Sequence, residues 1–100
     1  MSSRPVRFHP AALDETEAAL DWDRRRSIRA AEMFLHELDH AAKRIEVDPG
    51  QFPEHLFGKR RVVLRRFPYL VIFRVTTAGV EVIGVAHGHR RPGYWRNRVE

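Results

Sequence analysis

The chain has no cysteine among its 100 residues, so disulfide bonds and cysteine-ligated zinc or iron–sulfur centres are excluded. Its longest apolar run is only a few residues long, which is too short to span a bilayer. The segment from Met1 to Val6 also lacks the apolar core of a secretory signal. We therefore expect a cytoplasmic protein that does not associate with membranes.

Acidic residues are scarce in the second half of the chain. Residues 51–100 contain 10 Lys and Arg but only 3 Asp and Glu, a net charge of +7, whereas residues 1–50 contain 8 and 10, a net charge of −2. This asymmetry indicates that an acidic or nucleic-acid partner docks on structure built by the second half. A basic surface that only keeps the protein soluble is the alternative interpretation.

The composition is otherwise that of a folded globular protein, with 43% hydrophobic and 31% charged residues. The chain shows no repeat, no low-complexity tract and no linker long enough to divide it. Residues 1–100 are therefore expected to form a single domain with one modest core.

A short strand at residues 6–8 is followed by the first predicted helix. Pro10 suits the first helical position because its missing N–H would be unpaired there. Acidic residues in the early turns, Glu15 among them, suit the helix dipole. The helix is expected to run to about Arg25. It is expected to pack through Leu13, Ala19, Leu20 and Trp22.

A second helix is predicted to begin after Ser27, whose hydroxyl can cap an unpaired N–H. Apolar residues recur in it at spacings of three and four, which places them on one stripe. The stripe consists of Ile28, Ala31, Leu35, Leu38, Ala42 and Ile45, and Phe34 and Ala41 widen it. Pro49 and Gly50 end the helix. Phe52, Leu56 and Phe57 in the following loop are expected to cover an edge of the core.

Three strands are predicted in the rest of the chain, at residues 61–67, 69–76 and 80–87, because these segments are rich in Val, Ile, Phe and Tyr. Turn signals at Pro68 and at Ala78-Gly79 separate them. The order is therefore β-α-α-β-β-β, an α+β fold in which a two-helix hairpin packs on one face of a small antiparallel sheet.

If both turns contain two residues, the strand register gathers basic side chains on the face turned away from the helices. That face would carry Arg61, Arg65, Arg74 and His87 among Val63, Leu70, Ile72, Ile83 and Val85. The face under the helices would carry Val62, Leu64, Val71, Phe73, Val75, Val82, Gly84 and Ala86. A loop of odd length would instead reverse the facing of one strand, and the arginines could simply extend over an exposed sheet.

The C-terminal segment adds four arginines, Arg90, Arg91, Arg96 and Arg98, to two aromatic residues, Tyr94 and Trp95. Arginine can pair bidentately with phosphate or carboxylate, and aromatic rings provide flat surfaces that stack or anchor a partner. These six residues are therefore candidates for binding a partner. The alternative is that Tyr94 and Trp95 only hold the C-terminus against the core.

Residues 36–40 match the His-Glu-x-x-His pattern of zinc peptidases on a predicted helix. The helical phase, however, places His36 and His40 opposite the apolar stripe, on the solvent side. A zinc peptidase needs both histidines in a cleft together with a third ligand. We therefore expect no metal site and no cofactor.

Several motifs of the chain occur in a fixed order. The first half has Phe8-His9-Pro10-Ala11-Ala12, a helix with Phe34-Leu35, and Pro49-x-x-Phe52-Pro53. The second half has the segment from Arg65 to Val75 and Val85-Ala86-His87-x-x-Arg90-Arg91-Pro92-x-Tyr94-Trp95. In these motifs the chain resembles the RelE/ParE toxin superfamily, and its ParE branch most closely. The order and spacing of these pieces, with the terminal His-x-x-Arg-Arg-Pro, form the specific part of the match.

The resemblance implies the toxin of a type II toxin–antitoxin pair, neutralised in a hetero-oligomer by an acidic antitoxin that wraps around the basic domain. The ParE branch poisons DNA gyrase, and such a toxin would be a binding protein without chemistry of its own. Arg61, Arg65 and Arg74 would then contact antitoxin carboxylates, and the segment from Arg90 to Arg98 would reach gyrase.

The alternative is the RelE branch, which cuts messenger RNA on the ribosome without a metal. Arg61, Arg65 and Arg74 would then stabilise the phosphate, and His87 or His89 would transfer protons. Hydrophobic Val63 and Leu70 stand where the nuclease branch tends to have basic residues, and this difference argues against the ribonuclease interpretation. A third possibility is a family member that has lost its toxicity.

Overall fold

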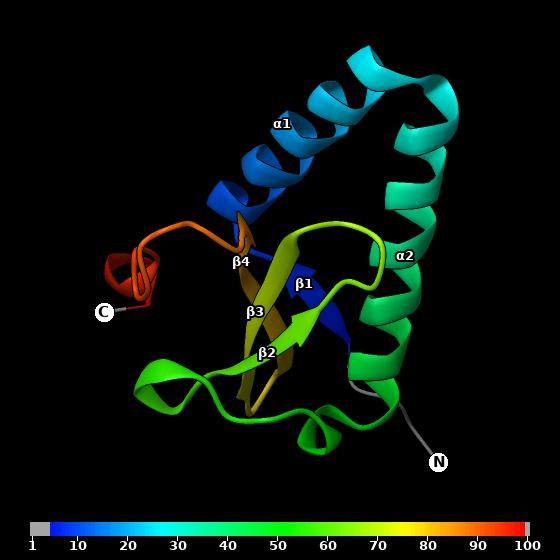
Figure 1. Ribbon diagram of the computed structural model, residues 1–100. Coiled ribbons are helices and arrows are strands. Elements are labelled where there is room, and N and C mark those ends of the chain that lie inside the picture. The colour runs from blue at the N-terminus through cyan, green and yellow to red at the C-terminus, as the bar shows by residue number, and fades with distance from the viewer. Residues whose placement is uncertain (1–4, 100) are drawn as a thin grey trace.

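Two helices lie over one face of a four-stranded sheet in the computed structural model, which describes residues 5–99 (Figure 1). The prediction that the N-terminus lacks a secretory signal falls mostly on Met1 to Arg4, which lie outside the described residues. The helices and strands are β1 (Val6–Phe8), α1 (Pro10–Arg26), α2 (Ile28–Val47), β2 (Arg60–Val63), β3 (Tyr69–Thr76) and β4 (Gly79–His87). Three short 3₁₀ turns are η1 (Pro49–Gln51), η2 (Leu56–Gly58) and η3 (Arg96–Arg98). The predicted order and the α+β class are confirmed.

The strands are arranged in the order β1-β4-β3-β2, and the sheet is mixed. β2, β3 and β4 form the predicted antiparallel meander, but β1 pairs with β4 in parallel, from Val6 beside Val80 to Phe8 beside Val82. The two helices make this possible, because they carry the chain over the sheet between β1 and the meander. β4 thus becomes an inner strand between β1 and β3.

Both helices begin with side-chain caps. The Nδ1 atom of His9 accepts a hydrogen bond of 3.0 Å from the Ala11 N–H, and Pro10 takes the first helical position as predicted. The Ser27 hydroxyl accepts from the Ala30 N–H at 2.9 Å, which confirms the predicted N-cap of α2. These caps satisfy N–H groups that have no partner within the helix.

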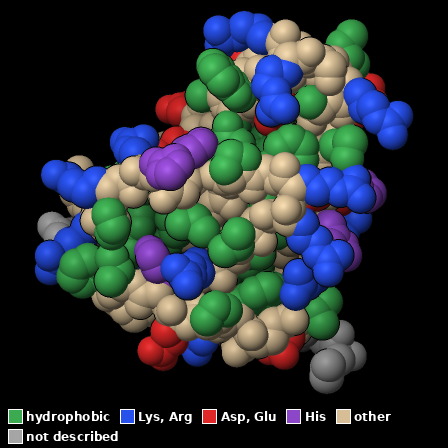
Figure 2. Space-filling view, viewed as in Figure 1, with side chains coloured by type: hydrophobic (Ala, Val, Ile, Leu, Met, Phe, Trp, Pro, Cys, Tyr) green, Lys and Arg blue, Asp and Glu red, His purple; other side chains and the backbone are tan. Residues whose placement is uncertain are grey.

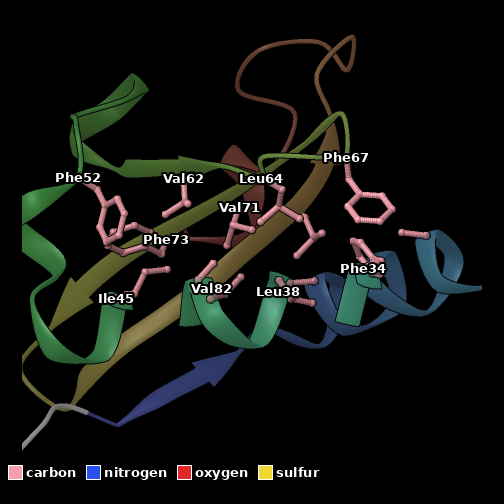
Figure 3. Close-up of a cluster of buried hydrophobic side chains, with 14 of the residues drawn as sticks. Phe34, Leu38, Ile45, Phe52, Val62, Leu64, Phe67, Val71, Phe73 and Val82 are labelled. Carbon is pink, nitrogen blue, oxygen red and sulfur yellow. The ribbon is translucent and has the colours of Figure 1, made fainter. Parts of the chain in front are cut away.

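The core lies between α2 and the sheet (Figure 3). α2 buries Ala31, Phe34, Leu38, Ala41 and Ile45. All five belong to the predicted, widened stripe, although two of its other members, Ile28 and Leu35, are 70% and 44% exposed. The broad ring of Phe34, fully buried between Phe67 and Tyr69, decides which side of α2 faces the sheet.

α1 approaches the sheet through small side chains. It buries Ala12 and Ala19, whereas Leu13 and Trp22, which were predicted to pack, are mostly exposed. Alanine at the contact positions lets the helix axis lie close to β4. Phe52 closes the far end of the core against Phe73, as predicted for this loop, while Leu56 and Phe57 remain exposed.

β2 is shorter than predicted because its last residues form a loop. The strand ends at Val63, and Glu37 of α2 accepts the N–H groups of Arg65 and Arg66 at 3.0 and 3.2 Å. The register shifts by two residues, so that Arg61 lies opposite Ile72 rather than opposite Arg74. A shift of two preserves the facing of side chains, and Arg61 therefore stays on the outer face.

A β-bulge in β4 reverses the predicted facing of its last residues. Ile72 pairs with Gly84 while Phe73 pairs with Val82, which leaves Ile83 as the extra residue. A single extra residue exchanges the two faces beyond the bulge. Four predicted placements after it are therefore wrong: Gly84 and Ala86 lie on the outer face, Val85 packs in the core, and His87 lies on the side of the helices.

Candidate functional site

The outer face of the sheet is not open, because the C-terminal segment folds back over it. Trp95 is 0% exposed and packs with Ile72 and Ile83 in a second apolar cluster. Figure 1 shows this segment on the side of the sheet away from α2. The alternative in which Trp95 holds the C-terminus against the protein is thus the one observed.

Tyr94 depends on a glycine beneath it. A Cβ atom added to Gly84 would lie 2.8 Å from the Tyr94 hydroxyl oxygen, so only a glycine leaves room for the phenol. Gly84 follows the bulge that turns it to the outer face. The bulge and the glycine together create the seat for the C-terminal segment.

Glu15 of α1 joins this segment to the sheet. Its carboxylate makes a bidentate ion pair with Arg98, with two N–O distances of 2.9 Å, and accepts from the Tyr94 hydroxyl at 3.0 Å. It also accepts the Val85 N–H at 2.9 Å. Both charged side chains are only 15% exposed. We call Glu15, Tyr94 and Arg98 the carboxylate clamp.

The clamp satisfies backbone groups that the sheet leaves unpaired. The ladder between β1 and β4 ends where Phe8 meets Val82. Beyond that point the Val85 N–H donates to Glu15, and Arg98 donates to the Ile83 carbonyl at 2.8 Å. An unpaired backbone group buried away from water is costly, so the two charged side chains complete this edge of β4.

Burial alone would raise the pKa of Glu15, but the hydrogen bonds from Arg98, Val85 and Tyr94 and the charge of Arg98 outweigh it, so the pKa lies below its ordinary value. Burial and the adjacent carboxylate raise the pKa of Tyr94. The clamp is therefore an ionised carboxylate held by a neutral phenol and a guanidinium at neutral pH.

The clamp positions several cationic side chains on one surface. The guanidinium of Arg90 lies 4.1 Å from the centre of the Tyr94 ring, and that of Arg96 lies 4.1 Å from the centre of the Phe57 ring. Lys59 lies 5.9 Å from the Trp95 ring. Burial lowers the pKa of His55, and the charge of Arg61 lowers it further.

We define the cationic surface as Lys59, Arg61, Arg90, Arg91 and Arg96. Residues 55–61 and 82–99, which supply these side chains, contain no acidic residue, and the neighbouring Glu15 is paired with Arg98. In Figure 2, Lys and Arg side chains lie around the C-terminal end of the chain, and a second group lies beside α2. The cationic surface combines part of the predicted basic strand with the predicted basic C-terminal segment.

Phe57 supports the cationic surface in an unusual backbone conformation. Its φ of 56° is in the left-handed region, and its side chain is 51% exposed. Gly93, at φ 79°, lies against the ring, where an added Cβ would be 3.2 Å from the nearest ring carbon. A strained residue that presents an exposed aromatic ring is typical of functional sites.

The other predicted site residues lie elsewhere. Arg74 is on the outer face but pairs with Glu81 at 2.9 Å. Arg65 lies in the β2–β3 loop, in a groove beside His36, Glu37 and His40 of α2. Of the four residues predicted to share the outer face, Arg61 and Arg74 lie on it, whereas the placement of Arg65 and His87 is wrong.

His87 lies on the side of the sheet that carries the helices. It is opposite Tyr69, whose ring it meets edge-on at 5.9 Å, and it stacks on His89 at 4.9 Å. The bulge at Ile83 moved it there, away from Arg61 and Arg74. The histidine and the arginines required by the nuclease interpretation thus do not come together.

The sequence did not identify Glu15 as a site residue, because its position in the early turns of the helix was explained by the helix dipole alone. Periodicity alone could not distinguish it from its acidic neighbours, because its partners come from β4 and the C-terminal segment.

His36 and His40 are exposed on α2 as predicted. Within residues 5–99, no group of three or more His, Cys, Asp or Glu side chains could hold a metal ion. No helix in the same range has the length and apolarity to cross a membrane.

Comparisons with known proteins agree with this architecture. A solved structure of the chromosomal ParDE TA system from P. aeruginosa matches with a TM-score of 0.68 and 17% sequence identity, over 84% of this chain and 95% of the other. At that identity the likeness shows the fold alone. No curated protein sequence matches. The family described as the ParE toxin of the type II toxin–antitoxin system parDE matches residues 6–92. Because this match covers well over half of the chain, the protein belongs to the ParE toxin family of type II toxin–antitoxin systems.

Proposed function

We propose that the protein acts by binding, that DNA gyrase is its target, and that an acidic antitoxin neutralises it in a hetero-oligomer. The observation that carries this proposal is the cationic surface, in which Lys59 lies by the Trp95 ring, Arg90 lies on Tyr94, and the segments that supply these cations, residues 55–61 and 82–99, contain no acidic residue. A surface of this charge attracts an acidic partner and accelerates its association.

The geometry favours binding over catalysis. A metal-independent nuclease needs a proton-transfer group beside the cations that stabilise the phosphate. His87 lies on the opposite face of the sheet from Arg61, and the charge of Arg74 is already balanced by Glu81. Tyr94, the aromatic hydroxyl near the C-terminus, is held by Glu15 and has a raised pKa, which makes it a poor base.

The clamp gives the C-terminal segment a fixed shape before any partner binds. Ordering a flexible segment at an interface costs free energy that a preorganised segment has already lost. Glu15 and Trp95 therefore support binding without touching a partner, by holding Arg90 and Arg91 at fixed positions.

The proposal is tested by inducing the protein in cells without its antitoxin and measuring incorporation of labelled precursors into DNA, RNA and protein. We expect DNA synthesis to fall first, with a DNA-damage response, while protein synthesis continues in the first minutes. Early arrest of protein synthesis with cleavage of ribosome-bound message would contradict it. Normal growth on induction would instead show that the chain has lost its toxicity.

A matched pair of variants links the phenotype to the surface. Arg90→Gln with Arg91→Gln removes two charges from the cationic surface, and Arg24→Gln with Arg25→Gln removes two exposed charges from the end of α1. Both variants have the same net charge. We expect the first to abolish growth arrest and the second to preserve it.

The antitoxin is tested by co-expression with the product of an adjacent short reading frame that encodes an acidic chain. We expect the two proteins to purify as one complex and growth to be restored. An acidic product that neither binds nor protects would contradict this part of the proposal.

A further inference from the structure

The turn at residues 56–59 has a phenylalanine at a position where the backbone favours another residue. Phe57 and Gly58 both have positive φ angles, of 56° and 72°. The Lys59 N–H donates to the Leu56 carbonyl at 3.1 Å, and two left-handed residues closed by such a bond form a type I′ turn. Asparagine, aspartate or glycine is preferred at the first of the two positions, because other side chains strain a left-handed backbone. The turn itself therefore does not explain Phe57.

Packing of the core does not explain this phenylalanine either. The Phe57 side chain is 51% exposed, although its ring meets the Trp95 ring edge-on at 6.0 Å and Arg96 stacks on it at 4.1 Å. The adjacent Leu56 is 40% exposed. A half-exposed ring gains only part of the free energy that full burial provides, and here it also imposes backbone strain. Strained residues of this kind cluster at binding sites.

The contacts of Phe57 hold its ring in one orientation. The Lys59 ammonium donates to the Phe57 carbonyl at 2.8 Å, which fixes the turn around the strained residue. Gly93 lies against the ring, since a Cβ added to it would be 3.2 Å from the nearest ring carbon. Trp95, on the edge of the ring, is fully buried. An exposed side chain that is already ordered loses little conformational entropy when a partner covers it.

The charges beside the ring indicate what kind of partner covers it. Lys59 belongs to the same turn, and Arg91 lines the same hollow as Phe57. Residues 55–61 contain no acidic residue. An aromatic side chain with cations around it is complementary to an apolar pocket bordered by carboxylates on a folded protein. An acidic antitoxin can pair with the same cations, but an extended chain has no preformed pocket for the ring. We therefore assign the ring to the folded target.

We propose that Phe57 is the apolar anchor through which the toxin binds its target, with its ring inserted into an apolar pocket that carboxylates border. The proposal rests on the proposed function, in which the target is a protein. Aromatic residues are enriched in the cores of protein interfaces, and a few such anchors carry most of the binding free energy. The cations that would pair with the carboxylates around the pocket are Lys59, Arg61, Arg90 and Arg91.

The test removes the ring and keeps the charges. Phe57→Asn introduces a residue that tolerates the left-handed conformation, and Phe57→Gly removes the strain altogether. Both variants should keep a urea midpoint at or above that of the wild type and should still co-purify with the antitoxin. Half-maximal inhibition of purified gyrase should require at least about thirtyfold more of either variant, as for the loss of a binding hot spot. Leu13→Gln is the control, because it removes a side chain that is 49% exposed on α1, and it should inhibit as the wild type does.

Two outcomes would overturn the anchor. One is inhibition by Phe57→Asn and Phe57→Gly at the same concentrations as the wild type, which would leave gyrase as the target. The other is loss of antitoxin binding together with gyrase inhibition, which would show that the ring only maintains the fold.

Growth arrest on induction separates the anchor from the identity of the target. We expect Phe57→Asn to be harmless and Leu13→Gln to arrest growth. If the wild type arrests growth without inhibiting gyrase, and Phe57→Asn is harmless, the assignment of gyrase fails and the anchor stands. Normal growth with the wild type would overturn both.

Discussion

Replacement of Glu15 by alanine is the sharpest test of the carboxylate clamp. The substitution removes the acceptor of the Val85 N–H and of the Tyr94 hydroxyl, and it leaves the Arg98 guanidinium without its counter-ion. Arg98 keeps one bond, to the Ile83 carbonyl. A side chain of α1 would thus disconnect the C-terminal segment from the sheet.

The expected cost follows from the burial of the pair. Glu15 and Arg98 are each only 15% exposed, so little solvent can replace the lost partner. Removing one member of a buried ion pair costs about 3–5 kcal/mol. A small domain is stable by only about 5–15 kcal/mol, so the loss should be a large fraction of the free energy of unfolding.

Urea unfolding measures this loss, with far-ultraviolet circular dichroism and, in a Trp22→Phe background, Trp95 fluorescence as separate probes. Glu15→Gln keeps one acceptor oxygen and should cost less, about 1.5–3 kcal/mol, because the charge and only one of the two acceptors are lost. Glu17→Ala on the exposed side of the same helix is the control and should change stability by less than about 0.5 kcal/mol. A Glu15→Ala protein as stable as the Glu17→Ala protein would refute the reasoning.

Three other results are expected from the same structure. Because the pKa of Glu15 is lowered on folding, its stabilisation is present above the unfolded value of about 4.3 and is lost as the pH falls through the lower folded value. The urea midpoints of wild type and Glu15→Gln should therefore converge as the pH falls below about 4.3. Asp23 is 1% exposed, its Oδ2 has no hydrogen-bond partner within the described residues, and burial raises its pKa. Asp23→Asn should therefore increase the free energy of unfolding by about 1 kcal/mol, which a higher thermal midpoint would show. Gly84→Ala should displace Tyr94, cost about 1–3 kcal/mol and shift Trp95 emission to longer wavelength, and unchanged emission would argue against the close contact.

Local chemistry made the elements predictable. Pro10 and Ser27 marked the starts of both helices, and the concentration of Val, Ile, Phe and Tyr located β3 and β4 within about one residue. The facing of β2 was also predicted correctly, because the longer loop shifted its register by two residues and not by one.

The site was harder to predict because one backbone irregularity and several long-range contacts create it. Ile83 looks like an ordinary strand residue, and nothing around it signals the bulge that moves His87 to the other face. Glu15 bonds to residues 70 and more positions away, which periodicity cannot detect. The sequence did show that Arg90 and Arg91 lie in the basic second half of the chain, and this charge pattern located the cationic surface better than strand register did.

The most direct test of the central claim is a DNA supercoiling assay with purified gyrase and added toxin. The account predicts that the wild-type protein inhibits supercoiling, that Arg90→Gln with Arg91→Gln does not, and that Arg24→Gln with Arg25→Gln inhibits as the wild type does. Gyrase that remains fully active at every toxin concentration, while a translation reaction with ribosomes stops, would contradict it.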